Sequence, residues 1–319
     1  MAATRNLPTD DPHLFRVVDR SGNWTHYFHD ELNEYLPAVN HINTIGFPKG
    51  AGLIEWFKRM TPEEIENRVT SAQEQGANVH SAIRYLTAGQ SIKIDQAFTN
   101  DRGDTALLSA NEWDCIVSWI EWAKLCKPMV ARYETALWNK KYKYAGTADF
   151  IGSIELPVGM KLYIDDKLTV NKVARRIYLN PLDYKTGGAY DEHKIQTSAY
   201  TACNPMKSKA EWYTGTLRLG TRHQNGGWEL RLWSADKTKY HFTVFLTALF
   251  NFKFLTGGKS FEPDNSQIPT VLEIKVPLIK GRKAKNVGTP NKGLSNGQRQ
   301  AGKSVKDQEG RATLRENIN

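Results

Sequence analysis

The sequence has few cysteines and no long hydrophobic run, and both absences narrow the class of protein. Three of its 319 residues are cysteines, namely Cys115, Cys126 and Cys203. Such a small, odd number does not indicate a disulfide framework, so we expect a reducing compartment such as the cytoplasm. No apolar run approaches the ~20 residues of a membrane-spanning helix. Residues 1–6 lack the apolar core of a secretion signal. We therefore expect no membrane association.

Most of the positive charge lies near the C-terminus. The net charge is +9, and residues 279–319 hold ten Lys or Arg and three Asp or Glu, which gives +7 and leaves +2 for the rest. From Gly281 onward Gly, Asn, Lys, Gln and Ser dominate, and such a segment buries too little apolar surface to fold. We expect a flexible basic tail over residues 279–319. It could attract phosphates, or it could be a solvated tail without such a role.

Local patterns predict both helices and strands. Capping boxes at Thr61 and Ser109 open helices over residues 61–86 and 110–126. Further helices are expected over residues 53–60, 190–203 and 238–255. Strands are expected over residues 15–20, 24–28, 129–138, 143–151, 162–165, 177–187, 211–219 and 227–233. The first two of these strands form a hairpin with a turn at Gly22-Asn23.

One group of polar residues indicates chemistry on phosphates. Asp183 and Lys185 are two positions apart on an expected strand, so their side chains project from the same face. Asp149 lies on another expected strand. If the two strands are neighbours, the two carboxylates converge and repel each other unless a cation lies between them. Hard ions such as Mg²⁺ prefer carboxylate oxygens, and a nearby lysine can orient a water or stabilise charge on a phosphate. The set is suited to phosphodiester hydrolysis.

Four motifs then occur in order over about 125 residues. They are Gly76-Ala77-Asn78-Val79-His80, Gly146-Thr147-Ala148-Asp149, Asp183-Tyr184-Lys185-Thr186-Gly187 and Gln196-x-x-x-Tyr200. Together they resemble the RecB-like branch of the PD-(D/E)XK nucleases, and the resemblance covers about residues 30–255. Ala148 replaces the proline after which the family is named, as is common in this branch. The resemblance implies an α/β fold with a central mixed β-sheet flanked by helices, similar to the core of restriction endonucleases.

A second Asp-x-Lys sequence, Asp165-Asp166-Lys167, competes with the one that ends at Lys185. Asp166 has no lysine two residues later, and only Lys185 is followed by Thr-Gly and then by the Gln-x-x-x-Tyr helix. We therefore expect the site to use Asp183 and Lys185. Residues 152–176 are interpreted as a sheet excursion or a surface insertion. Pro181 suits an edge strand or a β-bulge near the site.

The resemblance implies roles for the residues of these motifs. His80, Asp149, Asp183 and the backbone carbonyl of Tyr184 would hold Mg²⁺ or Mn²⁺, and Lys185 would position the attacking water. Taken alone, a histidine on a helix is also consistent with an ordinary core or surface residue. The metal interpretation therefore depends on the downstream carboxylates.

Further residues are candidates for catalysis or DNA contact. Glu134 would bind a second metal ion or a water, or would face solvent from an edge strand. Gln196 and Tyr200 share a helix face and would contact DNA, unless Tyr200 is simply buried beside a polar neighbour. The remaining DNA-contact candidates are Thr186, Arg218 and Arg231. The two arginines could instead form a solvated face.

The function implied by the resemblance is that of a metal-dependent DNA nuclease. An exonuclease acting on DNA ends in recombination, repair or phage replication is favoured over an endonuclease or an inactive DNA-binding recombination scaffold. Its partners would be DNA and a single-strand annealing or binding protein, in the cytoplasm, or the host cytoplasm for a phage protein. CRISPR adaptation nucleases usually carry four cysteines for an iron–sulfur cluster, and the three cysteines here do not match, so no cluster is expected. Residues 1–60 would be an N-terminal hairpin and helical extension, 61–278 the nuclease domain and 279–319 the tail.

Overall fold

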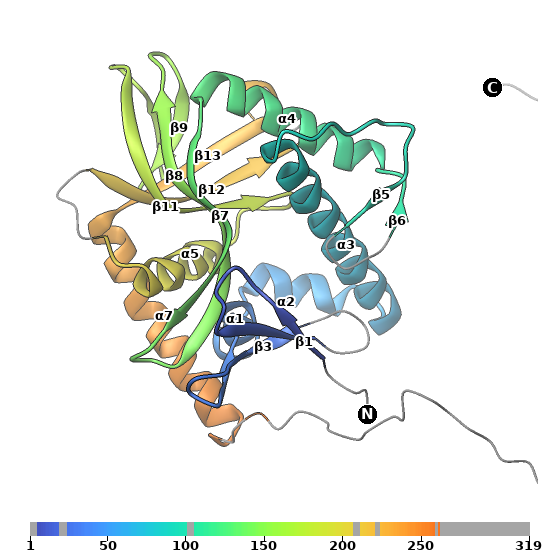
Figure 1. Cartoon of the computed structure of the whole chain (residues 1–319), viewed down its shortest axis with the longest axis vertical. Coiled ribbons are helices and arrows are strands. Elements are labelled where there is room, and N and C mark those ends of the chain that lie inside the picture. The colour runs from blue at the N-terminus through green and yellow to red at the C-terminus, as the bar shows by residue number, and fades with distance from the viewer. Residues whose placement is uncertain are drawn as a thin grey trace, which may run out of the picture. The chain divides into compact units, whose positions relative to one another are not determined.

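A large mixed sheet organises the protein (Figure 1). The computed structural model describes residues 5–18, 24–100, 105–206, 211–220, 224–258 and 261. Among them, seven strands form one sheet in the order β10–β9–β13–β12–β11–β8–β7. The strands are β7 (Met129–Asn139), β8 (Tyr144–Leu156), β9 (Lys161–Ile164), β10 (Lys167–Val170), β11 (Arg175–Lys185), β12 (Trp212–Leu219) and β13 (Trp228–Ser234). β11 runs parallel to β12 and β13 to β9, whereas the other neighbouring pairs are antiparallel.

Helices cover both faces of this sheet (Figure 1). They are α1 (Val39–Gly46), α2 (Ala51–Lys58), α3 (Pro62–Thr87), α4 (Ala110–Cys126), α5 (Asp191–Cys203) and α7 (Ala235–Leu255), with a short turn α6 (Gln224–Gly227). α3 and α4 bury Ile83 and Trp122 with Phe150 of β8 on one face. α5 and α7 bury Ala199 and Phe245 with the next residue of β8, Ile151, on the other. Successive side chains of a strand point to opposite faces, so β8 contributes to both cores.

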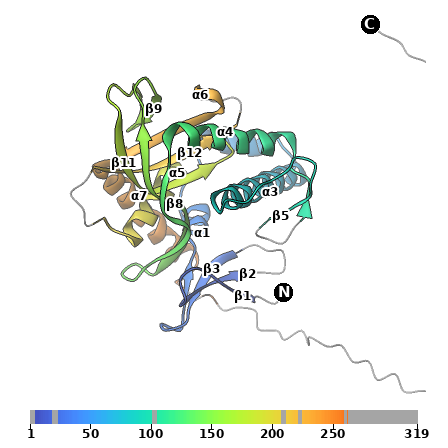
Figure 2. The ribbon, with the colours of Figure 1, turned by 45° about the horizontal axis from the view of Figure 1, so that its top comes forward.

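A second, smaller sheet lies beside the projecting end of the β7–β8 ribbon (Figures 1 and 2). Its antiparallel strands are β1 (Arg5–Pro8), β2 (Leu14–Val18), β3 (Trp24–His29) and β4 (Glu34–Pro37), in that order. Leu14 and Tyr27 of this sheet pack in one buried cluster with Ala136 of β7 and Ala145 of β8. A two-stranded pair, β5 (Phe98–Thr99) and β6 (Thr105–Ala106), follows α3. No described helix has both the length and the apolar character needed to cross a membrane.

The expected α/β architecture, with a large mixed sheet and flanking helices, is confirmed. α3 and α4 begin at the predicted capping boxes, in which the Thr61 and Ser109 hydroxyls accept the backbone N–H three residues later. Residues 152–176 form a sheet excursion: β8 runs to Leu156, and the β9–β10 hairpin then adds two strands at the edge.

The N-terminal prediction was incomplete. The expected hairpin exists as β2 and β3, but it is the centre of a four-stranded sheet whose outer strands have weak sequence patterns. Gly22-Asn23 and the basic tail of residues 279–319 lie outside the described residues. The described residues before and after residue 60 belong to one unit, residues 1–268.

Candidate metal centre

Two adjacent strands bring a pair of carboxylates together. In the β7–β8 ladder, Tyr133 pairs with Phe150 and Thr135 with Ala148, so Glu134 and Asp149 lie opposite each other. Glu134 has a φ of 46°, in the left-handed region. A non-glycine residue in this region costs about 1–2 kcal/mol, and such residues cluster at functional sites. The unusual backbone aims the Glu134 side chain, which is 19% exposed, into a cavity. It does not face open solvent from the edge strand.

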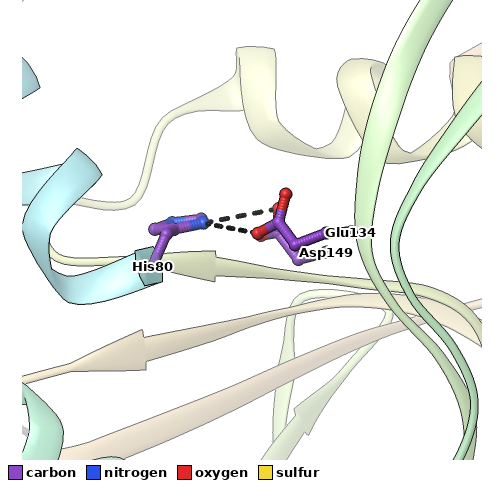
Figure 3. A group of neighbouring side chains, drawn as sticks. All are labelled: His80, Glu134 and Asp149. Atoms are coloured by element: carbon purple, nitrogen blue, oxygen red, sulfur yellow. Dashed lines mark ion pairs between the residues drawn. The ribbon is translucent and has the colours of Figure 1, made fainter. Parts of the chain in front are cut away.

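His80 of α3 completes a three-residue cluster with these carboxylates. Figure 3 shows its ring pointing at both acids. The ring Nδ1 lies 3.4 Å from Asp149 Oδ1 and 3.8 Å from Glu134 Oε1. One ligand atom from each residue lies within 4.8 Å of the others. The cluster joins residues 80, 134 and 149, and among the described residues it is the group with metal-ligand geometry.

The backbone of Tyr184, on β11, connects His80 of α3 with Asp149 of β8. Its N–H donates to Asp149 Oδ2 at 2.7 Å, and its carbonyl accepts a hydrogen bond from His80 Nε2 at 3.0 Å. The second bond leaves His80 Nδ1 facing the carboxylates. Metal-binding histidines commonly donate their other N–H to a carbonyl, which fixes the tautomer and the ring orientation. In this arrangement the Tyr184 carbonyl, predicted as a ligand, orients the imidazole.

Asp183 and Lys185 project from the same face of β11, as their spacing predicted. The Lys185 Nζ lies 2.6 Å from Asp183 Oδ2. The ladder registers of β11 with β8 and with β12 both shift between Leu179 and Leu182, so a β-bulge surrounds Pro181 as expected. The bulge lies just before Asp183 and affects the face of the sheet from which Asp183 and Lys185 project.

Helix α5 supports this ion pair from the other side. Gln196 Nε2 donates to Asp183 Oδ1 at 3.3 Å and to the Tyr200 hydroxyl at 2.9 Å. The Gln196 oxygen accepts from Lys185 Nζ at 3.2 Å. Tyr200 packs against Gly146 of β8, where an added Cβ would approach Tyr200 Cε1 to 2.4 Å. The absence of a side chain at Gly146 thus lets the α5 pair reach the site.

Burial and mutual repulsion perturb the ionisation of the acids. Burial raises the pKa of Asp183 to about 6; the ammonium of Lys185 opposes this rise and the charge of Asp149 adds to it. Burial also raises the pKa of Glu134, against the lowering influence of His80 and Arg16. For Asp149 the protonated imidazole of His80, Lys185 and the Tyr184 N–H outweigh burial, so its pKa is lowered.

For His80, burial and the neighbouring charges shift the pKa in opposite directions. Burial alone would lower its pKa, but the carboxylates of Asp149 and Glu134 raise it well above 6.5. Without a metal ion, the site therefore retains a proton on the imidazole to balance crowded negative charge.

The donor set fits a hard divalent cation. Three carboxylates, from Glu134, Asp149 and Asp183, line one cavity together with a neutralisable imidazole. Asp183 Oδ2 is buried and, apart from its ion pair with Lys185, accepts no hydrogen bond of favourable geometry from the described residues. Carboxylate oxygens with one imidazole suit Mg²⁺ or Mn²⁺. A bound cation would offset the burial and the repulsion from Asp149 that raise the pKa of Asp183.

The cavity has a volume of about 380 Å³, and one of its walls comes from the N-terminal sheet. Arg16, Trp24 and Tyr27 of this sheet line the cavity together with the carboxylates. None of these residues was predicted for the site. The sequence could not predict them, because nothing in residues 14–29 indicates which part of the chain these side chains face. Gln196, Tyr200 and Lys185, all predicted, line the same cavity.

The remaining predicted DNA contacts lie elsewhere. Thr186 and Arg218 line a different cavity of about 600 Å³. Arg218 and Arg231 both pair with one buried carboxylate, that of Glu229, at 2.8 and 2.7 Å. Arg231 also stacks over the Tyr163 ring. The structure therefore groups the two arginines with each other and not with the carboxylate cluster.

Comparison of the chain with protein-family models and with curated proteins finds no match to either.

Proposed function

We propose that the protein is a Mg²⁺- or Mn²⁺-dependent DNA nuclease of the PD-(D/E)XK type. The observation that carries the proposal is one cavity that contains both the His80–Glu134–Asp149 cluster and the Asp183–Lys185 ion pair. These residues come from α3, β7, β8 and β11, so the folding of distant segments concentrates them in one place. The resemblance of the four sequence motifs to RecB-like nucleases supports the same reading.

His80 Nδ1, Glu134, Asp149 and Asp183 are the groups that would hold the cation. When bound, a divalent ion lowers the pKa of a ligated water and stabilises the departing oxygen of a phosphodiester. The protein's own contribution is positional. The Tyr184 N–H and carbonyl fix Asp149 and His80, so little reorganisation accompanies the reaction.

Lys185 supplies a positive charge to the cavity that contains the cluster. Its ammonium is held between Asp183 and Gln196, at 2.6 and 3.2 Å. From there it can orient the attacking water and balance the negative charge that develops on the phosphate. Gln196 keeps the ammonium in place and is itself held by Tyr200. The dyad predicted to contact DNA thus also positions the lysine.

We favour an exonuclease acting on DNA ends, and one assay tests the activity and its mode together. Purified protein is incubated with linear and with closed circular DNA in Mg²⁺, in Mn²⁺ or in EDTA. We expect metal-dependent loss of the linear DNA and intact circles. Nicked or linearised circles would instead identify an endonuclease. Binding of DNA without cleavage in either metal would contradict the proposed activity and indicate a DNA-binding scaffold.

A further inference from the structure

Arg16 of β2 reaches the metal-site cavity from the N-terminal sheet. Its Nη2 donates to the Thr147 hydroxyl at 3.1 Å, and its guanidinium carbon lies 5.0 Å from the centre of the Trp24 ring. The Thr147 hydroxyl shares a second hydrogen bond, of 2.9 Å, with the Tyr27 hydroxyl. Two contacts therefore orient the arginine, a hydrogen bond to Thr147 and a cation–π contact with Trp24.

Arg16 acts on Glu134 through its charge, which lowers the pKa of that carboxyl. Among the described residues the arginine forms no ion pair, and its Nε is buried without a hydrogen-bond partner. Other arginines near the sheet differ: Arg218 and Arg231 pair with Glu229, and Arg176 pairs with Glu155 at 2.7 Å. Leaving a buried donor unpaired is unfavourable, so such groups call for a specific explanation. An oxygen atom of a bound ligand would accept a hydrogen bond from the Arg16 Nε.

The position of Arg16 relative to the carboxylates suits a neighbouring part of the same ligand. Thr147, which anchors Arg16, and Asp149 are two residues apart on β8 and both line the cavity. Two residues of strand span about 7 Å. A chain molecule whose reacting group meets the carboxylates therefore has an adjacent group near Arg16. Arginine presents a planar fork of donors that matches phosphate oxygens.

We propose that Arg16 forms a phosphate-binding subsite for the nucleic-acid strand that enters the cavity. This inference rests on the proposed nuclease function and extends it to a residue outside the four motifs. The cavity of about 380 Å³ is the size of a small-ligand pocket. A cavity of this size suits an unpaired strand better than a duplex, so we take the bound segment to be single-stranded. Arg16 and the carboxylates bind neighbouring groups of this strand.

The test measures binding apart from cleavage. A fluorescent single-stranded oligonucleotide is titrated with wild-type protein and with R16Q, R16K and R176Q variants, in Ca²⁺ to suppress hydrolysis and at several salt concentrations. We expect R16Q to weaken binding about 10- to 100-fold, as for loss of a charge-assisted hydrogen bond. Its salt dependence should fall by about one phosphate contact. R16K should keep the salt dependence but lose part of the affinity, because it lacks the fork. R176Q, changed at an exposed arginine outside the cavity, is the matched control and should bind like the wild type.

Cleavage kinetics in Mg²⁺ separate this inference from the proposed function. We expect R16Q to raise KM while kcat stays within a few-fold of the wild type. If R16Q matches the wild type in affinity and in salt dependence while the wild type cleaves DNA, the subsite is wrong and the nuclease proposal stands. If the wild type neither binds nor cleaves DNA, the nuclease proposal fails and the subsite fails with it.

Discussion

The chain contains two Asp-x-Lys sequences, and the structure gives them opposite environments. Asp165 and Asp166, with φ values of 51° and 66°, form the two-residue turn between β9 and β10, and Lys167 begins β10. Left-handed conformations at both central positions are those of the tight hairpin turn. Asp183 and Lys185, in contrast, lie on a central strand and point into a cavity. The same Asp-x-Lys motif therefore forms a turn at residues 165–167 and part of a candidate catalytic centre at residues 183–185.

The partners of the two aspartate sets explain the difference. Asp165 accepts hydrogen bonds from the Ser234 N–H and hydroxyl, which ties the hairpin to the start of α7. Burial alone would raise the pKa of Asp166, but the Trp233 indole and Lys194 outweigh it and the pKa is lowered. The pKa of Asp183 is raised to about 6, because it is buried beside another acid. The carboxylates of Asp165 and Asp166 therefore have a structural role, whereas that of Asp183 is available to a cation.

The largest contrast is expected from the two lysines. Lys185→Ala should reduce DNA cleavage by about 10²–10³-fold, as does removal of a group that stabilises transition-state charge. Lys167→Ala, at the exposed hairpin, should cleave like the wild type. Initial rates on linear DNA and circular dichroism of both variants provide the measurement. Equal rates for Lys185→Ala and the wild type would refute the assignment.

Metal affinity should distinguish the aspartates in the same way. Loss of an outer partner of a metal ligand typically costs 10–100-fold, so loss of the Asp149 carboxylate charge should cost at least about 100-fold. We expect Asp149→Asn to abolish tight Mn²⁺ binding in calorimetric titration and Asp166→Asn to leave it unchanged. Identical titrations for the wild type and Asp149→Asn would exclude Asp149 as a ligand.

Stability as a function of pH provides a third contrast, measured without metal. The folded pKa of Asp183 is raised from 3.8 to about 6, so its contribution is fully present below pH 3.8 and is lost as the pH rises through 6. The raised pKa of His80 acts in the same sense above pH 6.5. For Asp183 the difference corresponds to about 3 kcal/mol at most.

We therefore expect the free energy of unfolding in EDTA to fall between pH 4 and pH 7.5, and Asp183→Asn to flatten that fall. Added Mn²⁺ should restore stability at the higher pH, since it replaces the lost protons. Urea unfolding at several pH values tests both points. A metal-free wild type and an Asp183→Asn variant with parallel pH profiles would contradict the proposed ionisation.

The smallest effect is expected from the support provided by α5. Tyr200→Phe removes one hydrogen bond to Gln196, worth about 1 kcal/mol, and should slow cleavage about fivefold. Tyr213→Phe removes a tyrosine hydroxyl from the far end of β12, where it bonds to Glu211, and serves as the control. Rates and thermal unfolding of the two variants are compared. A Tyr200→Phe enzyme indistinguishable from the control would show that Gln196 holds Lys185 without the tyrosine.

Much of the local structure could be predicted because its signals are local. The capping boxes at Thr61 and Ser109 place the starts of α3 and α4, and the two-residue spacing places Asp183 and Lys185 on one face. The four-residue spacing brings Gln196 and Tyr200 together on α5. Each of these rules acts within one helix or strand, where backbone geometry alone determines which side chains are neighbours.

The sequence by itself determined most of the helices and strands and the relative positions of side chains within each of them, but it did not predict α1. Only the tertiary structure decided that Glu134 lies opposite Asp149, that Tyr184 links His80 to Asp149, and that Arg16 lines the cavity from a separate sheet. The physical reason is that these contacts join segments up to more than a hundred residues apart. Such contacts depend jointly on the strand register, on a β-bulge and on the packing of two buried cores. No local sequence pattern predicts any of these contacts.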